Sequence, residues 1–226
     1  MTAPVENTIA PKPDKSRSAE TTDRILEAAA TLFAEHGYNG VSIRMIVREA
    51  GVHISSLYHR YASKAELLEA VFRWYLEPMR REREALFADY LAWVGDSGAH
   101  DPKKLLAIMF GPAMRLSQTS DTGPLVSRLA GFFGTDPSPD VQAVIARIYN
   151  EEMKSFMELL RRSAPSLSDA AFFWAACSVY GTLIYVQSDL HRVRDVLQPQ
   201  SAAPDGDALD LIADFLAGGM KALEGK

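Results

Sequence analysis

The sequence predicts an all-α protein with an N-terminal three-helix helix-turn-helix domain followed by a larger helical domain. Apolar residues recur at i, i+3, i+4 and i+7 through most of the chain, which is the spacing of one helix face. No stretch alternates apolar and polar residues as a half-buried strand would. Segments rich in Pro, Gly and Ser separate helical stretches at about 102–118, 122–133, 138–163, 168–193 and 206–223.

The first helix is expected to begin at Thr21 or Thr22 and to end at Gly37. Residues 1–20 hold three prolines and almost no large apolar side chains. We therefore expect a disordered arm, which is either a solvated tail or a basic segment that reaches DNA. The expected division is an arm at 1–20, a helix-turn-helix domain at 21–66 and a larger helical domain at 67–226.

Two short amphipathic stretches lie between residues 42 and 64, with Gly51 between them. The first follows Ser42, a residue type that caps helix N-termini, and its apolar side chains share one face. Gly51 can adopt the left-handed conformation that turns the chain after a helix. The second stretch places Ile54 and Leu57 on one face. The pattern indicates either a DNA-reading unit or a pair of ordinary surface helices.

The outer face of the second stretch suits contact with DNA. It begins with small polar residues, which let a helix enter the major groove, and its Ser, His and Arg side chains can hydrogen-bond base edges or phosphates. Ser63 and Glu66 form a capping box that opens the next helix, where the charge of Lys64 and the helix dipole both favour a phosphate. The candidate DNA-binding residues are Arg44, His53, Ser55, Ser56, Tyr58, His59, Arg60 and Lys64.

The chain from residue 24 to residue 74 resembles the N-terminal domain of the TetR (tetracycline-repressor-like) family of transcriptional regulators. The resemblance rests on the string AGVHISSLYHRYASKAELLEAV, with its Leu-Tyr pair, the following aromatic residue and the Ser-Lys that opens the next helix. It implies that Tyr58 and Lys64 hold the DNA backbone. Val47, Ser55 and Tyr61 depart from the family's usual residues. We expect Val47 to change only the packing, and the other two to affect the operator sequence rather than DNA binding itself.

Composition narrows the possible classes. The 226 residues carry a net charge of −5, and 47% of them are hydrophobic, as in an ordinary globular protein. From Lys12 to Lys64 eight Lys and Arg stand against six acids, so a mildly basic N-terminal part precedes an acidic body. Cys177 is the only cysteine, which excludes an internal disulfide, and no signal peptide is recognisable. We expect a cytoplasmic protein.

The second domain is rich in Met and aromatic residues at helical spacing, which most often form core. The resemblance implies that this helical body also encloses a pocket for a small, hydrophobic or acyl effector, and such pockets are mostly apolar with a few polar groups. Polar candidates are Arg115, Gln118, Tyr149 and His191. The candidate ligand-binding residues are Met109, Met114, Phe132, Phe156, Trp174 and Tyr180.

Residues 170–188 form the longest uncharged stretch, close to membrane-spanning length. Its polar residues and the lack of a basic flank on its N-terminal side favour a helix buried within the protein, so we expect no membrane contact. The resemblance implies a homodimer in which residues 168–193 and 206–223 form a four-helix interface, the latter segment through a face that includes Leu209 and Leu216. A two-fold dimer presents two recognition helices to a palindromic site.

Enzyme motifs are missing from the sequence. It contains no glycine-rich phosphate loop, H-E-x-x-H, C-x-x-C or G-x-S-x-G. We expect no enzyme, no cofactor and no bound metal. The sequence therefore predicts a ligand-responsive transcriptional regulator, a repressor that a small effector releases from double-stranded operator DNA. The alternative is a helical protein–protein interaction module without DNA binding, whose contacts would not weaken steeply with salt as phosphate contacts do.

Overall fold

The computed structural model describes residues 15–97, 99–118, 123–134, 136–188 and 208–225, and these form helices without any strand. The N-terminal helices are α1 (Lys15–Gly40), α2 (Ile43–Ala50) and α3 (Ile54–Tyr58), followed by α4 (Lys64–Ser97). The body contains α5 (Pro102–Gln118), α6 (Gly123–Gly134), α7 (Pro139–Ser163), α8 (Asp169–Ser188) and α10 (Ala208–Ala222). The all-α prediction is confirmed.

Helix α1 begins earlier than the sequence predicted. It is helical from Lys15, six residues before Thr21, and the Thr22 hydroxyl donates to the Ser18 carbonyl one turn back at 3.0 Å. Residues 15–20 of the expected disordered arm are therefore helical, and residues 1–14 lie outside the described residues. The regular helix is interrupted at Gly37, where φ is 69° and ψ is 172°. Only glycine adopts this combination readily, which explains why the helix breaks at the predicted residue.

Helices α1, α2 and α3 share one small core. Ile25 and Phe33 of α1, Ile46 of α2 and Leu57 of α3 are each 0% exposed and belong to one buried cluster. Helix α3 has only five residues, too few to be stable as an isolated helix. Its position therefore depends on the burial of Leu57 rather than on its own hydrogen bonds.

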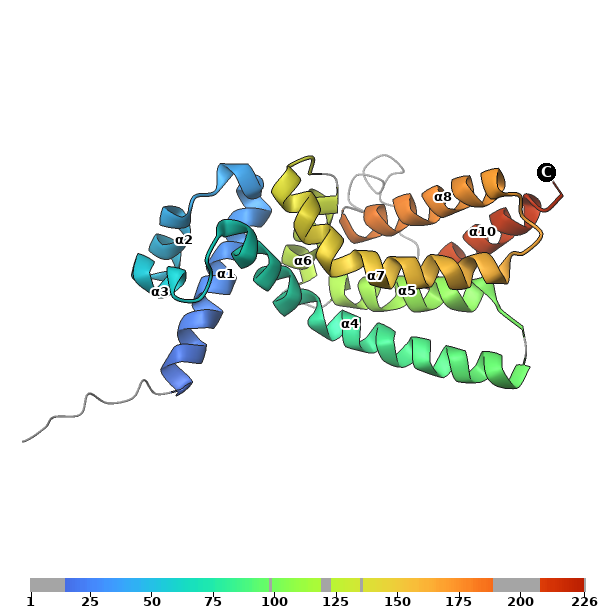
Figure 1. The fold of residues 1–226 in the computed structure, drawn as a ribbon, viewed down its shortest axis with the longest axis horizontal. Coiled ribbons are helices and arrows are strands. Elements are labelled where there is room, and N and C mark those ends of the chain that lie inside the picture. Colours follow the sequence, from blue (N-terminus) through green and yellow to red (C-terminus); the bar gives the residue numbers. More distant parts are fainter. Residues whose placement is uncertain (1–14, 98, 119–122, 135, 189–207, 226) are drawn as a thin grey trace, which may run out of the picture.

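Helix α4 joins the two halves of the molecule. It runs from the helix-turn-helix to the far end of the body (Figure 1), and it continues through Pro78. Its first part packs against α1 and later turns pack against α5 and α7. Leu67 and Leu68 are buried near its start, and Met79 and Tyr90 are buried further along. Helix α4 is therefore part of both the N-terminal core and the core of the body.

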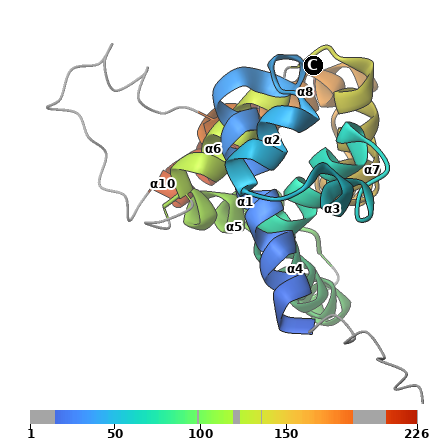
Figure 2. The same cartoon turned by 90° about the vertical axis from the view of Figure 1, so that its left-hand side faces the viewer.

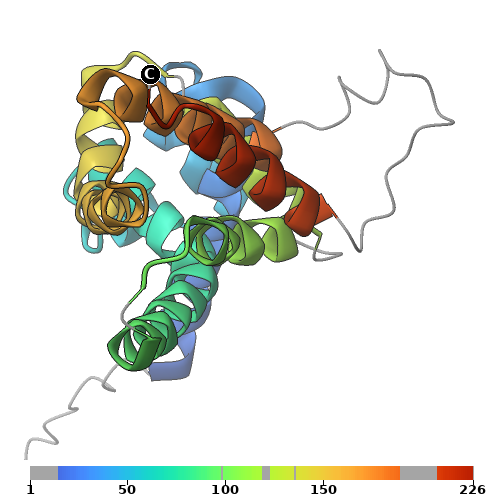
Figure 3. The same cartoon turned by 90° about the vertical axis from the view of Figure 1, so that its right-hand side faces the viewer.

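Helix α10 crosses the body and packs against α5 and α8 (Figure 3). Its buried residues are Ala213, Leu216 and Met220. The apolar face of residues 206–223 that the sequence assigned to the dimer interface is thus used inside the protomer, a correction to that prediction. A second apolar pair on α10, Leu211 and Phe215, remains 59% and 80% exposed.

Helix α8 has an unusual composition. Within the described residues, one segment, Asp169–Val186, is long and apolar enough to cross a membrane by length and composition, with a mean hydropathy of 1.3. A helix of a globular protein that is covered by other helices on two sides is equally apolar. Val179 and Leu183 are buried against the body, while Phe173 and Trp174 are 59% and 67% exposed.

Candidate DNA-binding surface and effector cavity

Local capping sets the turn between α2 and α3. The Ser42 hydroxyl accepts a hydrogen bond from the Met45 N–H at 3.3 Å, as an N-cap does. Gly51 adopts the left-handed conformation, with φ 61° and ψ 41°. The next residue, Val52, donates its N–H to the Val47 carbonyl at 3.0 Å, which completes the helix C-terminal motif. The predicted N-cap and glycine turn are both confirmed.

Arg24 of α1 braces this turn. Its Nη2 donates to the carbonyl oxygen of Gly51 at 2.9 Å and makes a second, short contact with the carbonyl oxygen of Ala50. A Cβ atom at position 51 would lie 2.7 Å from the same Nη2. Glycine is therefore required at position 51 both for its backbone conformation and for the approach of Arg24.

Helices α2 and α3 lie together at one end of the molecule (Figure 2). On α3 and its N-cap, the side chains of His53, Ser55 and Tyr58 are exposed, and His59 follows with its side chain also exposed. Arg44 is exposed on α2. The structure thus brings five of the predicted DNA-binding residues to the surface of the helix-turn-helix, whereas Ser56 is half-buried.

Arg60 has a different environment from the outer face that the helical spacing predicted. Its Nε donates to the Thr22 hydroxyl at 3.0 Å, its Nη1 to the Ser56 carbonyl at 2.8 Å, and its Nη2 to the hydroxyl and carbonyl of Ser18. The guanidinium therefore fastens the end of α3 to the first turns of α1.

Lys64 is also engaged within the domain. Its Nζ donates to the carbonyl oxygens of Tyr38 and Val41 at 2.8 and 3.0 Å, and it lies 4.0 Å from the centre of the Tyr38 ring. Burial lowers the pKa of Lys64. One half of the predicted capping box is present, since the Glu66 N–H donates to the Ser63 hydroxyl at 3.0 Å, whereas the Glu66 carboxylate accepts from the N–H of Ala62 at 2.7 Å. The ammonium group that was predicted to hold a phosphate thus binds the end of α1, after the break at Gly37, and the residue that follows the helix.

Ile54 is a surface residue that the sequence analysis missed. It was assigned to the buried stripe of α3, but it is 43% exposed because it occupies the first position of a helix with only five residues. An apolar side chain beside the exposed polar residues of α3 can contact a thymine methyl group in the major groove. The short length of the helix was not visible in the spacing of its apolar residues.

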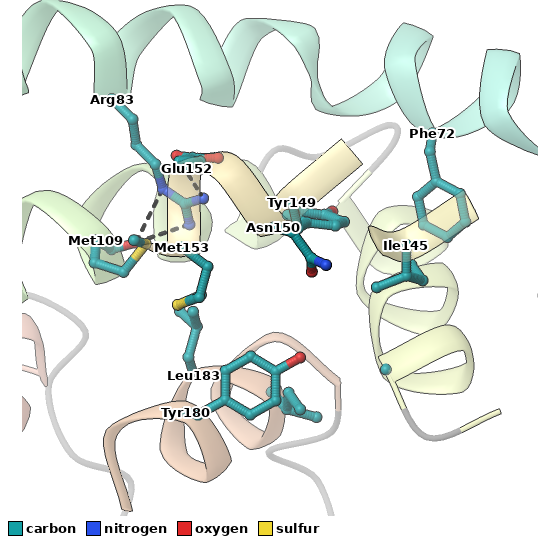
Figure 4. A pocket seen from close by; sticks show the side chains of 12 residues that line it. Phe72, Arg83, Met109, Ile145, Tyr149, Asn150, Glu152, Met153, Tyr180 and Leu183 are labelled. Carbon is teal, nitrogen blue, oxygen red and sulfur yellow. Dashed lines mark hydrogen bonds and ion pairs between the residues drawn. The ribbon is translucent and has the colours of Figure 1, made fainter. Parts of the chain in front are cut away.

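The body contains a cavity of about 270 Å³. It lies between α4, α5, the end of α6, α7 and α8, as the close-up in Figure 4 shows. Most of its wall is apolar, and a few polar side chains stand among the apolar ones, which is the usual form of a ligand site. The lining residues are Phe72, Arg83, Met109, Gly134, Ile145, Tyr149, Asn150, Glu152, Met153, Tyr180, Leu183 and Ile184.

Arg83 forms the charged end of the cavity (Figure 4). It is 2% exposed, and its Nη2 and Nε donate to the Met109 carbonyl at 2.8 and 3.2 Å. Its Nη1 donates to the Glu152 carboxylate at 3.3 Å. Pro112 in α5 lacks an N–H and disturbs the helix ladder next to this carbonyl. Burial also raises the pKa of Tyr149, so this neighbouring hydroxyl stays protonated.

The predicted ligand-binding residues separate into four groups. Met109 and Tyr180 line the cavity. Met114 and Phe156 are buried in the core and do not line it. Trp174 is on the exposed side of α8, away from the cavity, and the side chain of Phe132 in α6 lies outside the described residues.

Among the polar candidates, Tyr149 lines the cavity. Arg115 instead pairs with Glu82 on the surface, where its Nε donates at 3.0 Å. The side chain of Gln118 and the whole of His191 lie outside the described residues.

Arg83 and Glu152 were missed for an identifiable reason. Arg83 lies in a run of alternating Arg and Glu, which suggested a solvated helix face. However, Arg83 lies seven positions after Leu76, four after Met79 and seven before Tyr90, and all three of these residues are buried. A charged residue on an otherwise apolar helix stripe was therefore the available signal. Among the described residues, no three or more His, Cys, Asp or Glu side chains are grouped to hold a metal ion.

Helix α7 connects the cavity to the helix-turn-helix. Its N-terminal residue Asp140 accepts a hydrogen bond from the Tyr38 hydroxyl at 3.0 Å, and the Ser138 hydroxyl before it accepts from Asn39 at 2.8 Å. Burial, together with the hydrogen bond to Asp140, raises the pKa of Tyr38 to about 12. The backbone carbonyl of the same Tyr38 holds Lys64. Helix α7, which forms one wall of the cavity, thus also contacts the C-terminal end of α1.

Comparison with known proteins identifies the family. Residues 25–71 match the model described as bacterial regulatory proteins, tetR family, and residues 107–219, half of the chain, match the tetracyclin repressor-like C-terminal domain. The chain belongs to the TetR family of transcriptional regulators. It is therefore a DNA-binding regulator with a repressor-like body, as the resemblance in its first domain implied. Members of the TetR family are normally not enzymes.

Individual relatives match only part of the chain in sequence. The HTH-type transcriptional repressor KstR2 of Mycolicibacterium smegmatis is 39% identical over 62 residues, which is 27% of this chain and 30% of that repressor. The chain thus spans about a third of that curated relative.

Two solved TetR-like structures share the fold over almost their whole length. FadR from Bacillus subtilis in complex with stearoyl-CoA has a TM-score of 0.59 at 16% identity, over 87% of this chain and 98% of that one. NalD, the secondary repressor of the MexAB-OprM multidrug efflux pump in Pseudomonas aeruginosa, has a TM-score of 0.60 at 21% identity, over 93% and 98%. These similarities establish the architecture of both halves.

Proposed function

We propose that this TetR-family protein is a cytoplasmic, ligand-responsive repressor that binds a palindromic operator as a homodimer and is released by a small, mostly apolar effector. The proposal rests on the position of helix α4. One end of this helix packs on the helix-turn-helix core, and its residues Phe72 and Arg83 line a mostly apolar cavity. The proposed domains are residues 21–66 for DNA binding and residues 67–226 for effector binding and dimerisation. A protein–protein interaction module without DNA binding is the competing function.

The exposed residues of the helix-turn-helix carry the proposed DNA contacts. Tyr58, at 53% exposure, contacts the DNA backbone, whereas His59 and Ser55 read base edges in the major groove. Arg60 and Lys64, whose donors already bind protein groups, position α3 and its flanking turn rather than supplying free cations.

The proposed dimer interface is formed by the exposed apolar side chains of α8 and α10. Helix α8 presents Phe173 and Trp174, and α10 presents Leu211 and Phe215. Exposed apolar groups of this size and number are typical of an interaction surface. A two-fold axis between paired α8 and α10 helices would cover them and would present two α3 helices to successive major grooves.

Substitution of Phe215 tests this interface. Phe215→Glu places a charge on α10 where the side chain is 80% exposed, so it should leave the protomer folded and separate the dimer. Leu91→Glu on α4, where the side chain is also exposed (51%) but lies outside the proposed interface, is the matched control. Sedimentation velocity should show a monomer only for the Phe215 variant. If both variants sediment like the wild type, another face mediates association.

The proposed release from the operator depends on α4 and α7, which line the cavity and also contact the N-terminal half. An effector that fits one arrangement of α4 and α7 better than another shifts the population of that arrangement. Since both helices contact the N-terminal core, the shift changes the separation of the two α3 helices in the dimer. A coupling of about 1–3 kcal/mol lowers operator affinity roughly 5- to 150-fold.

The experiment for DNA binding is fluorescence anisotropy on duplex DNA from the region beside the protein's own gene, with a scrambled duplex as the control. Tight, sequence-selective binding that weakens steeply with salt is expected, because phosphate contacts release counterions. A random-sequence selection follows if that duplex shows no preference. Failure to select any sequence would favour the interaction module.

The residue roles are tested in the same assay. Tyr58→Ala should weaken binding to all duplexes alike, whereas His59→Ala should change which DNA sequence the protein prefers. Uniform losses from both variants would contradict the assignment of His59 as a base reader.

A further inference from the structure

The cavity contains one charged pair and no net charge among its described lining residues. Among the lining residues that the structure describes, Arg83 and Glu152 are the only ones with charged side chains, and they are bound to each other at 3.3 Å. Arg80 does not line this cavity; it is bound to Glu77 and Glu84, and it shares a neighbouring hollow with Glu152. The positive charge of Arg83 is therefore already balanced before any ligand enters.

The position of Arg83 is fixed from outside the cavity. Two of its N–H groups bind the backbone carbonyl of Met109, so the guanidinium cannot follow a ligand without leaving that carbonyl. A guanidinium has five N–H donors. Three bind Met109 and Glu152, and the remaining two have no acceptor among the described residues. These two donors are available to an oxygen acceptor in the space that Arg83 lines.

The rest of the wall determines the body of the ligand. The volume of about 270 Å³ is close to the lower end of the range of about 300–1,000 Å³ that is usual for small-molecule sites. Ile145 and Phe72 offer apolar surface on the side of the cavity away from Arg83, and Met153 and Leu183 add apolar surface nearer to it (Figure 4). A ligand that fills this space is a compact hydrocarbon body with one hydrogen-bond acceptor at one end.

We propose that the effector is an uncharged apolar molecule with a carbonyl oxygen that accepts from Arg83, and that Glu152 makes the cavity reject the matching carboxylate. A carboxylate in the same place would leave an excess negative charge beside Glu152 in a largely buried site, and an unpaired buried charge is strongly unfavourable. A carbonyl oxygen uses the free donors and leaves the ion pair intact. This inference rests on the proposed effector role of the cavity and defines the class of compound that fills it.

The test uses pairs of compounds that differ only in replacing a methyl group by a charged oxygen. Methyl octyl ketone is compared with nonanoate, and benzylacetone with hydrocinnamate, by isothermal titration calorimetry on the full chain at about pH 7, where both acids are ionised. At least one ketone should bind the wild type at least about ten-fold more tightly than its carboxylate. Equal or tighter binding of the carboxylates overturns the proposal, and so does a lack of binding by all four compounds.

Glu152→Gln provides a reversal that a merely apolar pocket would not show. The amide keeps the size of the side chain and leaves Arg83 uncompensated, so the carboxylate should become the tighter member of the pair. Glu151→Gln removes the neighbouring carboxylate, which is exposed and does not line the cavity, and should keep the wild-type preference. An unchanged preference in Glu152→Gln, with the circular dichroism of a folded protein, overturns the role of Glu152. The wild-type comparison decides the ligand class even if this variant does not fold.

Operator affinity measured with and without the preferred ketone separates this inference from the function on which it rests. A ketone that binds in the cavity but leaves operator affinity unchanged removes the regulatory proposal and leaves the ligand class standing. A carboxylate that binds more tightly than its ketone and releases the operator overturns the ligand class and supports the regulatory proposal.

Discussion

The substitution Gly51→Ala probes the turn of the helix-turn-helix most directly. A residue with a Cβ in the left-handed conformation costs about 1–2 kcal/mol. The new Cβ would also lie 2.7 Å from Nη2 of Arg24. Because that atom is the end of a flexible side chain, it can move away, but it then loses its hydrogen bonds to the carbonyls of Ala50 and Gly51. Loss of these hydrogen bonds costs about 0.5–1.5 kcal/mol at this exposed site. Together with the backbone cost, the unfolding free energy should fall by about 1.5–3.5 kcal/mol.

A double-mutant cycle separates the two contributions. In an Arg24→Met background no guanidinium is displaced, so Gly51→Ala should cost only the backbone part, about 1–2 kcal/mol. Methionine keeps an unbranched stem and a good helix propensity in α1. The coupling between the two substitutions should therefore be about 0.5–1.5 kcal/mol, whereas independent sites add within about 0.3–0.5 kcal/mol.

The assay is urea unfolding followed by circular dichroism at one fixed protein concentration, because dimer dissociation would otherwise shift the midpoint. Gly95→Ala is the control, since Gly95 lies within α4 and a Cβ there meets nothing within 4 Å. That variant should be neutral or more stable by up to about 1 kcal/mol. Additive effects of Arg24→Met and Gly51→Ala would refute the role of Arg24, and a loss below about 1 kcal/mol for Gly51→Ala would refute the backbone argument.

Two further predictions concern the contacts between α7 and the N-terminal half. Tyr38→Phe removes the hydrogen bond to Asp140 and should lower the unfolding free energy by about 0.5–1.5 kcal/mol in the same urea assay; an unchanged midpoint would show that this contact does not stabilise the fold. Hydrogen bonds from Arg73 and from Arg147 of α7 hold the pKa of the Glu69 carboxyl below its usual range, so their stabilisation is present above the unfolded pKa of about 4.3 and is lost as the pH falls through the folded value. Glu69→Gln should therefore be less stable than the wild type by roughly 1 kcal/mol at neutral pH, and the difference should vanish in acid; a difference that persists below about pH 3 in thermal melts would contradict the assignment.

The sequence by itself determined the local structure of this protein. Ser42 and Gly51 act within a few residues of their own positions, because a helix N-cap and a left-handed C-terminal turn are formed by neighbouring backbone groups. The same is true of the Ser63 half of the capping box. The turn of the helix-turn-helix and the family resemblance could therefore be predicted from spacing and residue type, whereas the start of α1 and the short length of α3 could not.

Only the tertiary structure decided which side chains are free to act. Arg60 looked like a DNA contact, but its partner Thr22 is 38 positions away in the sequence, and Arg83 looked solvated until Glu152, 69 positions away, was placed beside it. Likewise, Leu216 packs inside the protomer while Phe215 remains exposed, although both are large apolar residues of one helix. Helical periodicity identifies the faces of a helix, but the packing of distant elements determines which face is covered and which charges are paired.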